Sequence, residues 1–299
     1  MNPFFDPDFT SQHNQLISDF NLARQQQPAS EQAINNFQSI IWHHYNHKKR
    51  PFAWRAHPTP YNVVVSEIML QQTQTSTVAP KFDAYIKAFP NFQTLADASF
   101  SEVLRHWKGL GYNRRAMALQ KIAQLIISNH QGILPSDSGV LESFPGIGPA
   151  TARSILAFAY NVPTAFIETN IRTVFIYFFF KNEKEITDKQ LFPLVQKAVD
   201  QHNPREWYYA LMDYGVMLKK TVGNVSKLSA HYTRQSTFQG SDRQIRGLIL
   251  QVLLDFPNGV ARHQLATILN KDPERVEKIM LDLHNEKFVT IKNNLVRLS

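Results

Sequence analysis

The chain has 299 residues, of which 43% are hydrophobic, so it can build a substantial core in one large domain or two smaller ones. It contains no cysteine, which excludes disulfides, zinc–thiolate sites and iron–sulfur clusters held by thiolates. The formal net charge of +8 favours a polyanionic partner, either nucleic acid or an acidic membrane surface.

The N-terminal residues 1–29 are rich in Gln, Asn and Pro, and they predict a loose arm that includes one short helix. The first residues, MNPFFDPDFT, lack the basic and then apolar pattern of a signal peptide. No apolar run has the length that spans a membrane. We therefore expect a cytoplasmic protein without a membrane partner, associated with the nucleoid if its source is bacterial.

Residues 30–218 predict a helical body. In its first segment Ile34, Phe37 and Ile41 recur on one helical face, and further apolar periods follow at short spacing. The segment Thr173–Phe180 is apolar but short, which predicts a buried helix. None of these segments alternates between apolar and polar residues as a half-buried strand does. The expected fold class is therefore mostly α.

The composition changes after the helical body. Residues 219–240 are polar and basic without a clear period, and they predict a linker. Residues 241–299 predict one helix, a helix-turn-helix-like pair, and two short strands around a Lys-Asn-Asn turn. That order is typical of a winged-helix domain, so we expect a small winged-helix-like domain at the C-terminus.

The strongest local signal is the stretch ESFPGIGPATARSILAF. Gly146 and Gly148 flank Ile147, and Pro149 stands where a helix is expected to begin. Glycines permit unusual backbone angles and close approach of another chain, and the N–H groups of a helix start can bind a phosphate oxygen. An ordinary helix–helix turn is the alternative, and for a bare Pro-Gly-x-Gly it is the commoner one. The basic charge of the chain and a carboxylate further on, Glu168, favour a functional hairpin over an ordinary turn.

Two carboxylates are candidates for acid–base chemistry. Glu67 shares a helix face with Val63 and Val64, and apolar neighbours raise the pKa of a carboxyl group. A partly buried Glu paired with a basic side chain is the alternative. Glu168 stands at an expected helix start, where the helix dipole favours the ionised form, and a plain N-cap is the alternative. Two carboxylates in unlike environments suit the cleavage of a glycosidic bond.

Several motifs, in order along the chain, resemble one protein family. FPGIGPATA followed by FIETNIRTVF resembles the helix-hairpin-helix DNA glycosylase superfamily. Within it, Pro51–Phe82, Leu104–Leu119 and Trp207–Leu218 are similar to the MutY-type adenine glycosylases. The resemblance extends over residues 30–220 and implies a glycosylase core with two helical lobes.

The resemblance implies a role for each carboxylate. Glu67 would protonate the adenine leaving group and then activate water, and Glu168 would stabilise the sugar cation. Asn170 would orient Glu168, although Asn is also favoured at a helix start. The family usually carries Asp where this chain has Glu168, which leaves room for a different substrate. Ala150 stands where strand-cutting members carry a Schiff-base lysine, so the resemblance implies a glycosylase without lyase activity.

The resemblance also implies contacts with a flipped base and its partner. Gln72 and Tyr112 match positions that insert into the duplex and contact the opposite base. Trp54 and Arg55 match residues that line the adenine pocket. The alternatives are a loop aromatic packed on the core for Tyr112 and a solvated charge for Arg55.

Contacts with the DNA backbone and with a cation follow from the same resemblance. Phosphate contacts are expected at Gly146, Gly148, Arg114, Arg115, Arg153, Lys219 and Lys220, although solvation explains each surface charge equally well. Hairpins of this family often bind K⁺ or Na⁺ through backbone carbonyls, here those of Glu142, Phe144 and Ile147. Residues 219–240 replace the family's cysteine-ligated cluster loop, and residues 241–299 replace its longer, mostly β Nudix-like domain.

The main hypothesis is a clusterless, monomeric, monofunctional DNA glycosylase. It would act on double-stranded DNA with a mismatch or a damaged base, flip out adenine opposite G or 8-oxoguanine, and hydrolyse its N-glycosidic bond. The first alternative is a glycosylase of the same fold for another mismatched or damaged base, such as a pyrimidine. The second is a non-catalytic DNA-binding protein, against which the presence of both carboxylates argues.

Overall fold

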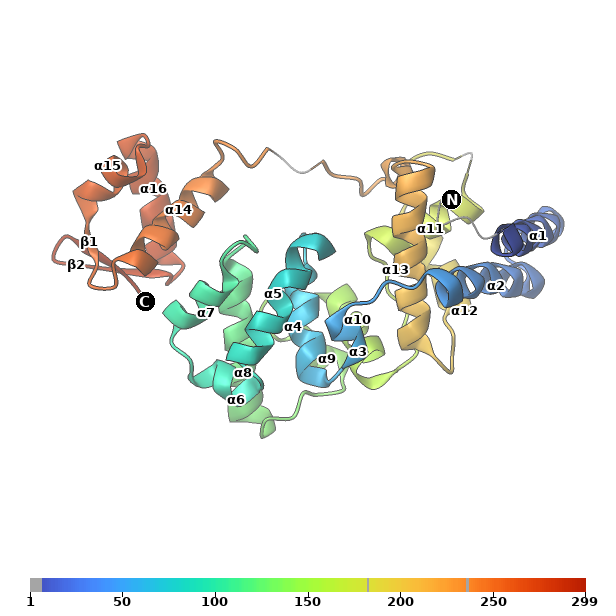
Figure 1. The fold of residues 1–299 in the computed structure, drawn as a ribbon, viewed down its shortest axis with the longest axis horizontal. Coiled ribbons are helices and arrows are strands. Elements are labelled where there is room, and N and C mark those ends of the chain that lie inside the picture. The colour runs from blue at the N-terminus through green and yellow to red at the C-terminus, as the bar shows by residue number, and fades with distance from the viewer. Residues whose placement is uncertain (1–6, 182, 235–236) are drawn as a thin grey trace. The chain divides into compact units, whose positions relative to one another are not determined.

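The computed structural model describes residues 7–181, 183–234 and 237–299, and most of them are helical (Figure 1). The prediction of a mostly α fold with a small C-terminal winged-helix-like domain is confirmed. The chain forms two compact units: one contains residues up to 63, 136–143 and 147–233, and the other contains residues 64–135, 144–146 and 234–299. Every helix within the described ranges is too short or too polar to cross a bilayer.

The first unit collects helices from both ends of the core. They are α1 (Pro7–Gln26), α2 (Glu31–Lys48), α3 (Ala53–Ala56), the first turn of α4 (Pro60–Leu70), α9 (Ser138–Glu142), α10 (Pro149–Tyr160), α11 (Thr169–Phe179), α12 (Asp188–Ala198), α13 (Pro204–Thr221) and the 3₁₀ turn η1 (Val225–Leu228).

Aromatic packing explains why the N-terminal segment is a helix. Phe20 of α1 is only 1% exposed, and its ring meets Phe178 and Phe179 edge-on at centroid distances of 5.3 and 5.4 Å. The prediction of a loose arm over residues 1–29 is therefore wrong for Pro7–Gln26. Its polar composition hid one buried face, and residues 1–6 lie outside the described part of the chain.

The segment that follows α13 is partly fastened to the first unit. Ile186 forms an isolated parallel bridge with Ser229. The N–H of Ile186 donates to the carbonyl of Leu228, and the N–H of Ala230 donates to the carbonyl of Ile186, both at 3.0 Å. Residues 219–230 of the predicted linker therefore belong to α13, η1 and this bridge. Two further linker residues, 235 and 236, are not among those described.

The second unit contains the rest of α4 and the helices that follow it. They are α5 (Thr75–Ala88), α6 (Phe92–Asp97), α7 (Phe100–Trp107), α8 (Arg114–His130) and the C-terminal elements. Its interior includes Ile68 of α4, Tyr85 of α5 and Trp107 of α7, each at most 1% exposed.

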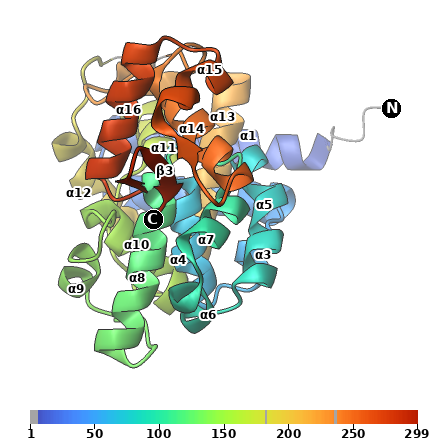
Figure 2. The same cartoon turned by 90° about the vertical axis from the view of Figure 1, so that its left-hand side faces the viewer.

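The C-terminal elements have winged-helix order. They are α14 (Asp242–Asp255), β1 (Val260–Ala261), η2 (Arg262–Gln264), α15 (Leu265–Leu269), α16 (Pro273–Asn285), β2 (Val289–Lys292) and β3 (Leu295–Leu298), seen from the side in Figure 2. The sheet is antiparallel with strand order β1-β3-β2, and the short strand β1 was not predicted.

Turn chemistry and apolar periodicity account for this domain. Asn293 and Asn294 have φ values of 50° and 61°, the left-handed pair that a two-residue hairpin needs and that Asn tolerates. Ile249 and Leu283 are fully buried in its core. Leu104 of α7 is part of the same buried cluster, so α7 and the C-terminal domain share a core.

Candidate active site

Glu168 is the N-cap of α11 in the first unit. Its Oε1 accepts hydrogen bonds from the backbone N–H groups of Asn170 (2.8 Å) and Ile171 (3.0 Å), and its Oε2 accepts one from the side-chain amide of Asn170 (3.2 Å). The same hydrogen bonds cap the helix and fix the carboxylate. The role of Glu168 as an N-cap therefore does not exclude a catalytic role. Asn170 therefore contacts both oxygens of the Glu168 carboxylate.

The segment before Glu168 is held in place by α13. The hydroxyl of Tyr208 donates to the carbonyl of Thr164 at 2.6 Å, and the ring of Phe166 lies 4.0 Å from that of Tyr208. Phe166 is only 2% exposed. These contacts fix the chain that enters α11, and they therefore fix the position of Glu168.

Burial sets the charge balance of Glu168. Burial raises the pKa of Glu168, while its hydrogen bonds from Asn170 and Ile171 and the positive charge of Arg172 lower it, and the net direction is upward. From the sequence we expected the helix start to keep Glu168 readily ionised. The hydrogen bonds and Arg172 do favour the ionised form, but burial outweighs them. The structure places a carboxylate at a helix start where its negative charge is poorly solvated, which strengthens its interaction with a nearby cation.

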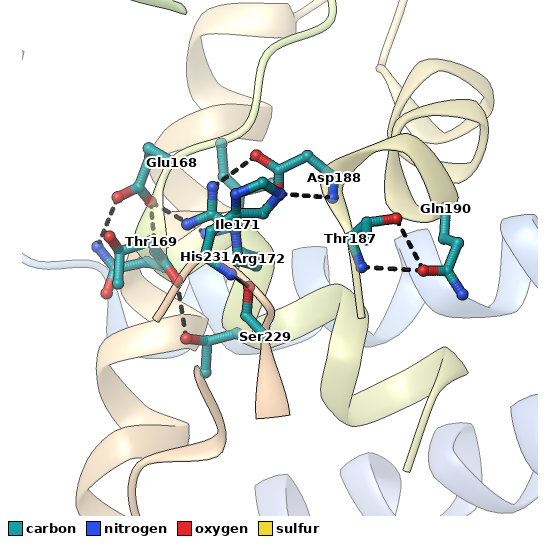
Figure 3. Close-up of polar contacts among 11 residues, drawn as sticks. Glu168, Thr169, Ile171, Arg172, Thr187, Asp188, Gln190, Ser229 and His231 are labelled. Carbon is teal, nitrogen blue, oxygen red and sulfur yellow. Dashed lines mark hydrogen bonds and ion pairs between the residues drawn. The ribbon is translucent and has the colours of Figure 1, made fainter. Parts of the chain in front are cut away.

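Arg172, Asp188 and His231 form a polar group next to Glu168 that sequence reasoning missed (Figure 3). Arg172 lies four residues after Glu168, and its guanidinium donates two bonds of 2.7 Å to the carboxylate of Asp188. The N–H of Asp188 donates to Nε2 of His231 at 3.3 Å. The i, i+4 spacing of Glu168 and Arg172 was the available signal.

A glycine in α13 allows the close approach of α11. A Cβ at Gly215 would lie 2.7 Å from both the Cβ and the carbonyl oxygen of Asn170. Any side chain at Gly215 would therefore push away the residue that orients Glu168. The signal in the sequence was an isolated glycine inside an otherwise helical pattern, DYGVML.

Glu67 lies on α4 in the second unit. It is half-buried, and the preceding residues Val64 and Val65 and the following residue Ile68 are fully buried. The structure thus places Glu67 on a largely apolar helix, as the sequence suggested.

Arg115 is buried and binds the end of α4. Its guanidinium donates to the carbonyls of Ile68 (2.9 Å), Met69 (2.8 Å) and Gln71 (2.5 Å). It also reaches the carbonyls of Leu110 and Gly111 at 3.1 and 3.2 Å. Arg115 was predicted to contact phosphate, but its side chain instead ties the loop after α4 to the loop before α8.

Those two loops carry the residues predicted to read the lesion. Gln72 and Tyr112 have φ values of 53° and 47°, a left-handed conformation that is uncommon for residues with side chains. The guanidinium of Arg115 lies 5.3 Å from the centroid of the Tyr112 ring. Arg115 therefore supports both loops, and backbone strain of this kind clusters at functional sites.

Arg55 lies in a buried ion pair in the first unit. Its guanidinium donates to both oxygens of Asp213 at 2.9 and 3.0 Å, and Arg50 donates to the same carboxylate at 2.7 Å. Arg55 also lies 4.4 Å from the centroid of the Tyr209 ring. A solvated charge is therefore wrong for Arg55, whose side chain is 10% exposed. Trp54 is buried against the ring of Phe52, with centroids 4.6 Å apart.

The hairpin between α9 and α10 needs glycine at one position. Gly146 has a φ of +78°, and its carbonyl accepts a bond of 3.0 Å from the side chain of Gln71. Gly148 is the N-cap of α10 with an ordinary φ of −95°, and a Cβ there would meet nothing within 4 Å. Pro149 is the first residue of α10, and the following Ala150 is exposed.

The predicted phosphate contacts differ in their surroundings. Lys219 and Lys220 are exposed at the end of α13. Arg153 is half-buried, with its guanidinium 5.9 Å from the ring of Phe192. Arg114 is exposed but donates to both oxygens of Glu286. Among the residues that the structure describes, no three His, Asp or Glu side chains are arranged so that they could hold a metal ion.

Residues 65–201 match the family described as HhH-GPD superfamily base excision DNA repair protein. A protein from Buchnera aphidicola (subsp. Baizongia pistaciae) named adenine DNA glycosylase is 34% identical over 61% of this chain, and the match spans only 52% of that relative. A protein of the same name from Mycolicibacterium smegmatis is 30% identical over 83% of this chain and 90% of its own length.

Solved structures share the fold at lower identity. A thermostable thymine-DNA glycosylase has a TM-score of 0.55 at 23% identity, covering 67% of this chain and 96% of its own. An endonuclease III in a non-covalent DNA complex has a TM-score of 0.53 at 15% identity, covering 62% and 85%.

Proposed function

The chain belongs to the HhH-GPD superfamily of base excision DNA repair proteins, and we propose that it is a monofunctional DNA glycosylase that removes adenine opposite G or 8-oxoguanine. The observation that carries this proposal is the carboxylate of Glu168, fixed by three hydrogen bonds at a helix start. The relatives named adenine DNA glycosylase support the choice of adenine.

The proposed reaction divides its work between two carboxylates. Glu67 donates a proton to the adenine ring, which makes the base a better leaving group, and then accepts a proton from the attacking water. Glu168 stabilises the positive charge that develops on the sugar as the N-glycosidic bond breaks. Asn170 holds Glu168 in orientation through the 3.2 Å side-chain bond.

Ala150 has no amine, so the proposed enzyme releases the base without forming a Schiff base with the sugar. The substrate is double-stranded DNA, bound by a monomer in the compartment that holds the genome. The N-terminal turn of α10 and the exposed Lys219 and Lys220 provide backbone N–H groups and positive charge for phosphates.

The proposal includes one cation and excludes one cofactor. K⁺ or Na⁺ would bind the backbone carbonyls of Glu142, Phe144 and Ile147 in the hairpin, and carbonyl oxygens are suitable ligands for such ions. A thiolate-ligated cluster does not fit a chain without cysteine.

One observation favours a second candidate, a glycosylase of the same fold for another base. Glu168 stands where the family usually has Asp, and its carboxylate extends one methylene further from the backbone. A pyrimidine substrate would place the sugar differently relative to this group.

A panel of duplexes with single mismatches or lesions, cleaved at abasic sites with alkali, tests these functions. Strand cleavage only at A opposite G or 8-oxoguanine supports the main proposal, and cleavage at another base supports the second candidate. Binding without any cleavage would mean that the fold has lost turnover. Glu67→Gln is expected to abolish base release, and a borohydride-trapped covalent complex would contradict the absence of lyase activity.

A further inference from the structure

A side chain from the C-terminal domain contacts the loop expected to read the opposite base. Nη1 of Arg243, on the first turn of α14, donates to the hydroxyl of Tyr112 at 2.8 Å. The same guanidinium lies 5.6 Å from the centroid of the Tyr112 ring. With Arg115 at 5.3 Å, two cations contact one tyrosine whose backbone is left-handed.

Further contacts join the C-terminal domain to α7 and α8 near this hydrogen bond. Glu286 at the end of α16 accepts two bonds each from Arg114 of α8 and Arg246 of α14. Arg114 and Arg246 hold the pKa of Glu286 at about 2, so this bridge is ionised at neutral pH. Apolar contact accompanies it, since the ring of Phe100 meets that of Phe288 at 5.5 Å.

Several arginines of the C-terminal domain pair with acidic side chains. Arg275 of α16 donates to Asp242 and to the carbonyl of Gly240, and Arg262 is paired with Glu277. The exposed residues of α16 include acidic and basic side chains side by side. A helix that reads DNA usually carries a cluster of positive charge. The mixed charge of α16 is therefore unlike that of a typical DNA-reading helix.

We propose that Arg243 is a positioning residue that fixes Tyr112, so that the winged-helix-like domain sets the discrimination of the base opposite the excised adenine. The inference rests on the proposed function. An arginine only donates hydrogen bonds, so the Tyr112 hydroxyl accepts on that side and its own O–H points away from Arg243. Losing this bond and the ring contact would let the side chain and its strained backbone occupy several conformations. A mobile tyrosine would contact every opposite base equally poorly.

A double-mutant cycle tests this role. Single-turnover rates of adenine release are measured on duplexes with A opposite 8-oxoguanine and A opposite C, and their ratio is the readout. Arg243→Ala and Tyr112→Phe should each lower the ratio about two- to tenfold, the range expected for one hydrogen bond. The double variant should lower it no further, because both changes remove the same contact. Arg243→Lys should recover part of the ratio.

Arg275→Ala is the matched control, because it removes an arginine from the same domain and a contact to the start of α14 without touching Tyr112. It should leave the ratio within about twofold. A wild-type ratio in Arg243→Ala would overturn the proposal. Multiplied effects in the double variant would also overturn it, because Arg243 would then act on DNA independently of Tyr112.

Failure of the proposed function is recognised separately. If the wild-type protein releases adenine from neither duplex, the assigned activity is wrong. The same cycle is then read in the Kd for the two duplexes, measured by fluorescence anisotropy. Non-additive losses of discrimination in binding would support the positioning role, and additive or absent losses would refute it.

Discussion

Replacing Glu168 by Gln should separate catalysis from stability. The amide oxygen of Gln can still accept from the N–H groups of Asn170 and Ile171, so the cap of α11 is retained. The side-chain bond to Asn170 is lost or reversed, at a cost of about 1 kcal/mol at any pH. The negative charge disappears, so base release should fall on the order of 10²- to 10³-fold, as it does when one preorganised electrostatic group is removed.

The stability effect has a defined pH dependence. Because burial raises the folded pKa of Glu168 above its unfolded value, ionisation destabilises the wild-type fold as the pH rises through the folded pKa. The variant has no such group, so its free energy of unfolding relative to wild type should increase with pH and then level off. Each unit of pKa elevation contributes about 1.4 kcal/mol to this increase.

Urea unfolding at a series of pH values between 4 and 8 measures the difference directly. The lost bond to Asn170 shifts the whole curve, whereas only the charge changes its slope. A difference that stays flat or falls with pH would refute the claim that burial dominates at Glu168. Glu168→Asp is the control that keeps the charge. Undiminished base release in Glu168→Gln would show that Glu168 takes no part in the mechanism.

Three further predictions concern stability. Arg115→Met should lower the free energy of unfolding in urea by on the order of 3 kcal/mol, because it leaves the carbonyls at the end of α4 without their donor. Arg114→Ala, in which the removed side chain is 72% exposed, should lower it by at most about 1 kcal/mol. Equal losses in the two variants would contradict the buried structural role of Arg115. Gly215→Ala should destabilise the fold by about 1–3 kcal/mol and reduce base release. Gly247→Ala in α14, where a Cβ meets nothing within 4 Å, should stabilise it by up to about 1 kcal/mol. An unchanged stability of Gly215→Ala would show that α11 and α13 can move apart. Burial lowers the pKa of His13 and His44 from 6.5 to about 4, so the melting temperature should fall as the pH drops from 6.5 to 4. The fall should be smaller in His13→Gln. A melting temperature that rises on acidification would contradict the burial of these two imidazoles.

The sequence predicted the helices and the winged-helix-like domain because their signals are local. The Asn-Asn turn between β2 and β3 and the apolar periods of α14 and α16 need no distant partner to be recognised. The helix α1 was missed because its few apolar residues become informative only once Phe20 meets the aromatic rings of α11. Local composition cannot report a contact made by tertiary packing.

The same limit applies to the candidate site. The resemblance of the motifs to a known family predicted Glu67, Glu168 and Asn170, because each is named by its place in a motif. The buried partners of Arg55 and Arg115 could not be predicted, because a charge in a sequence looks the same whether it faces solvent or a buried acceptor. Their partners lie far along the chain, in α13 and at the end of α4, and only the fold brings them within hydrogen-bonding distance.

Hydrogen bonds and an ion pair connect the segment after α13 to the surroundings of Glu168. Backbone bonds join residues 228–230 to Ile186, and His231 accepts from the N–H of Asp188. Asp188 in turn holds Arg172, whose charge acts on Glu168 (Figure 3). The segment after α13 is thus connected by three successive contacts to the candidate catalytic carboxylate. Hydrogen bonds and one ion pair make this connection, so its strength should depend on pH and salt.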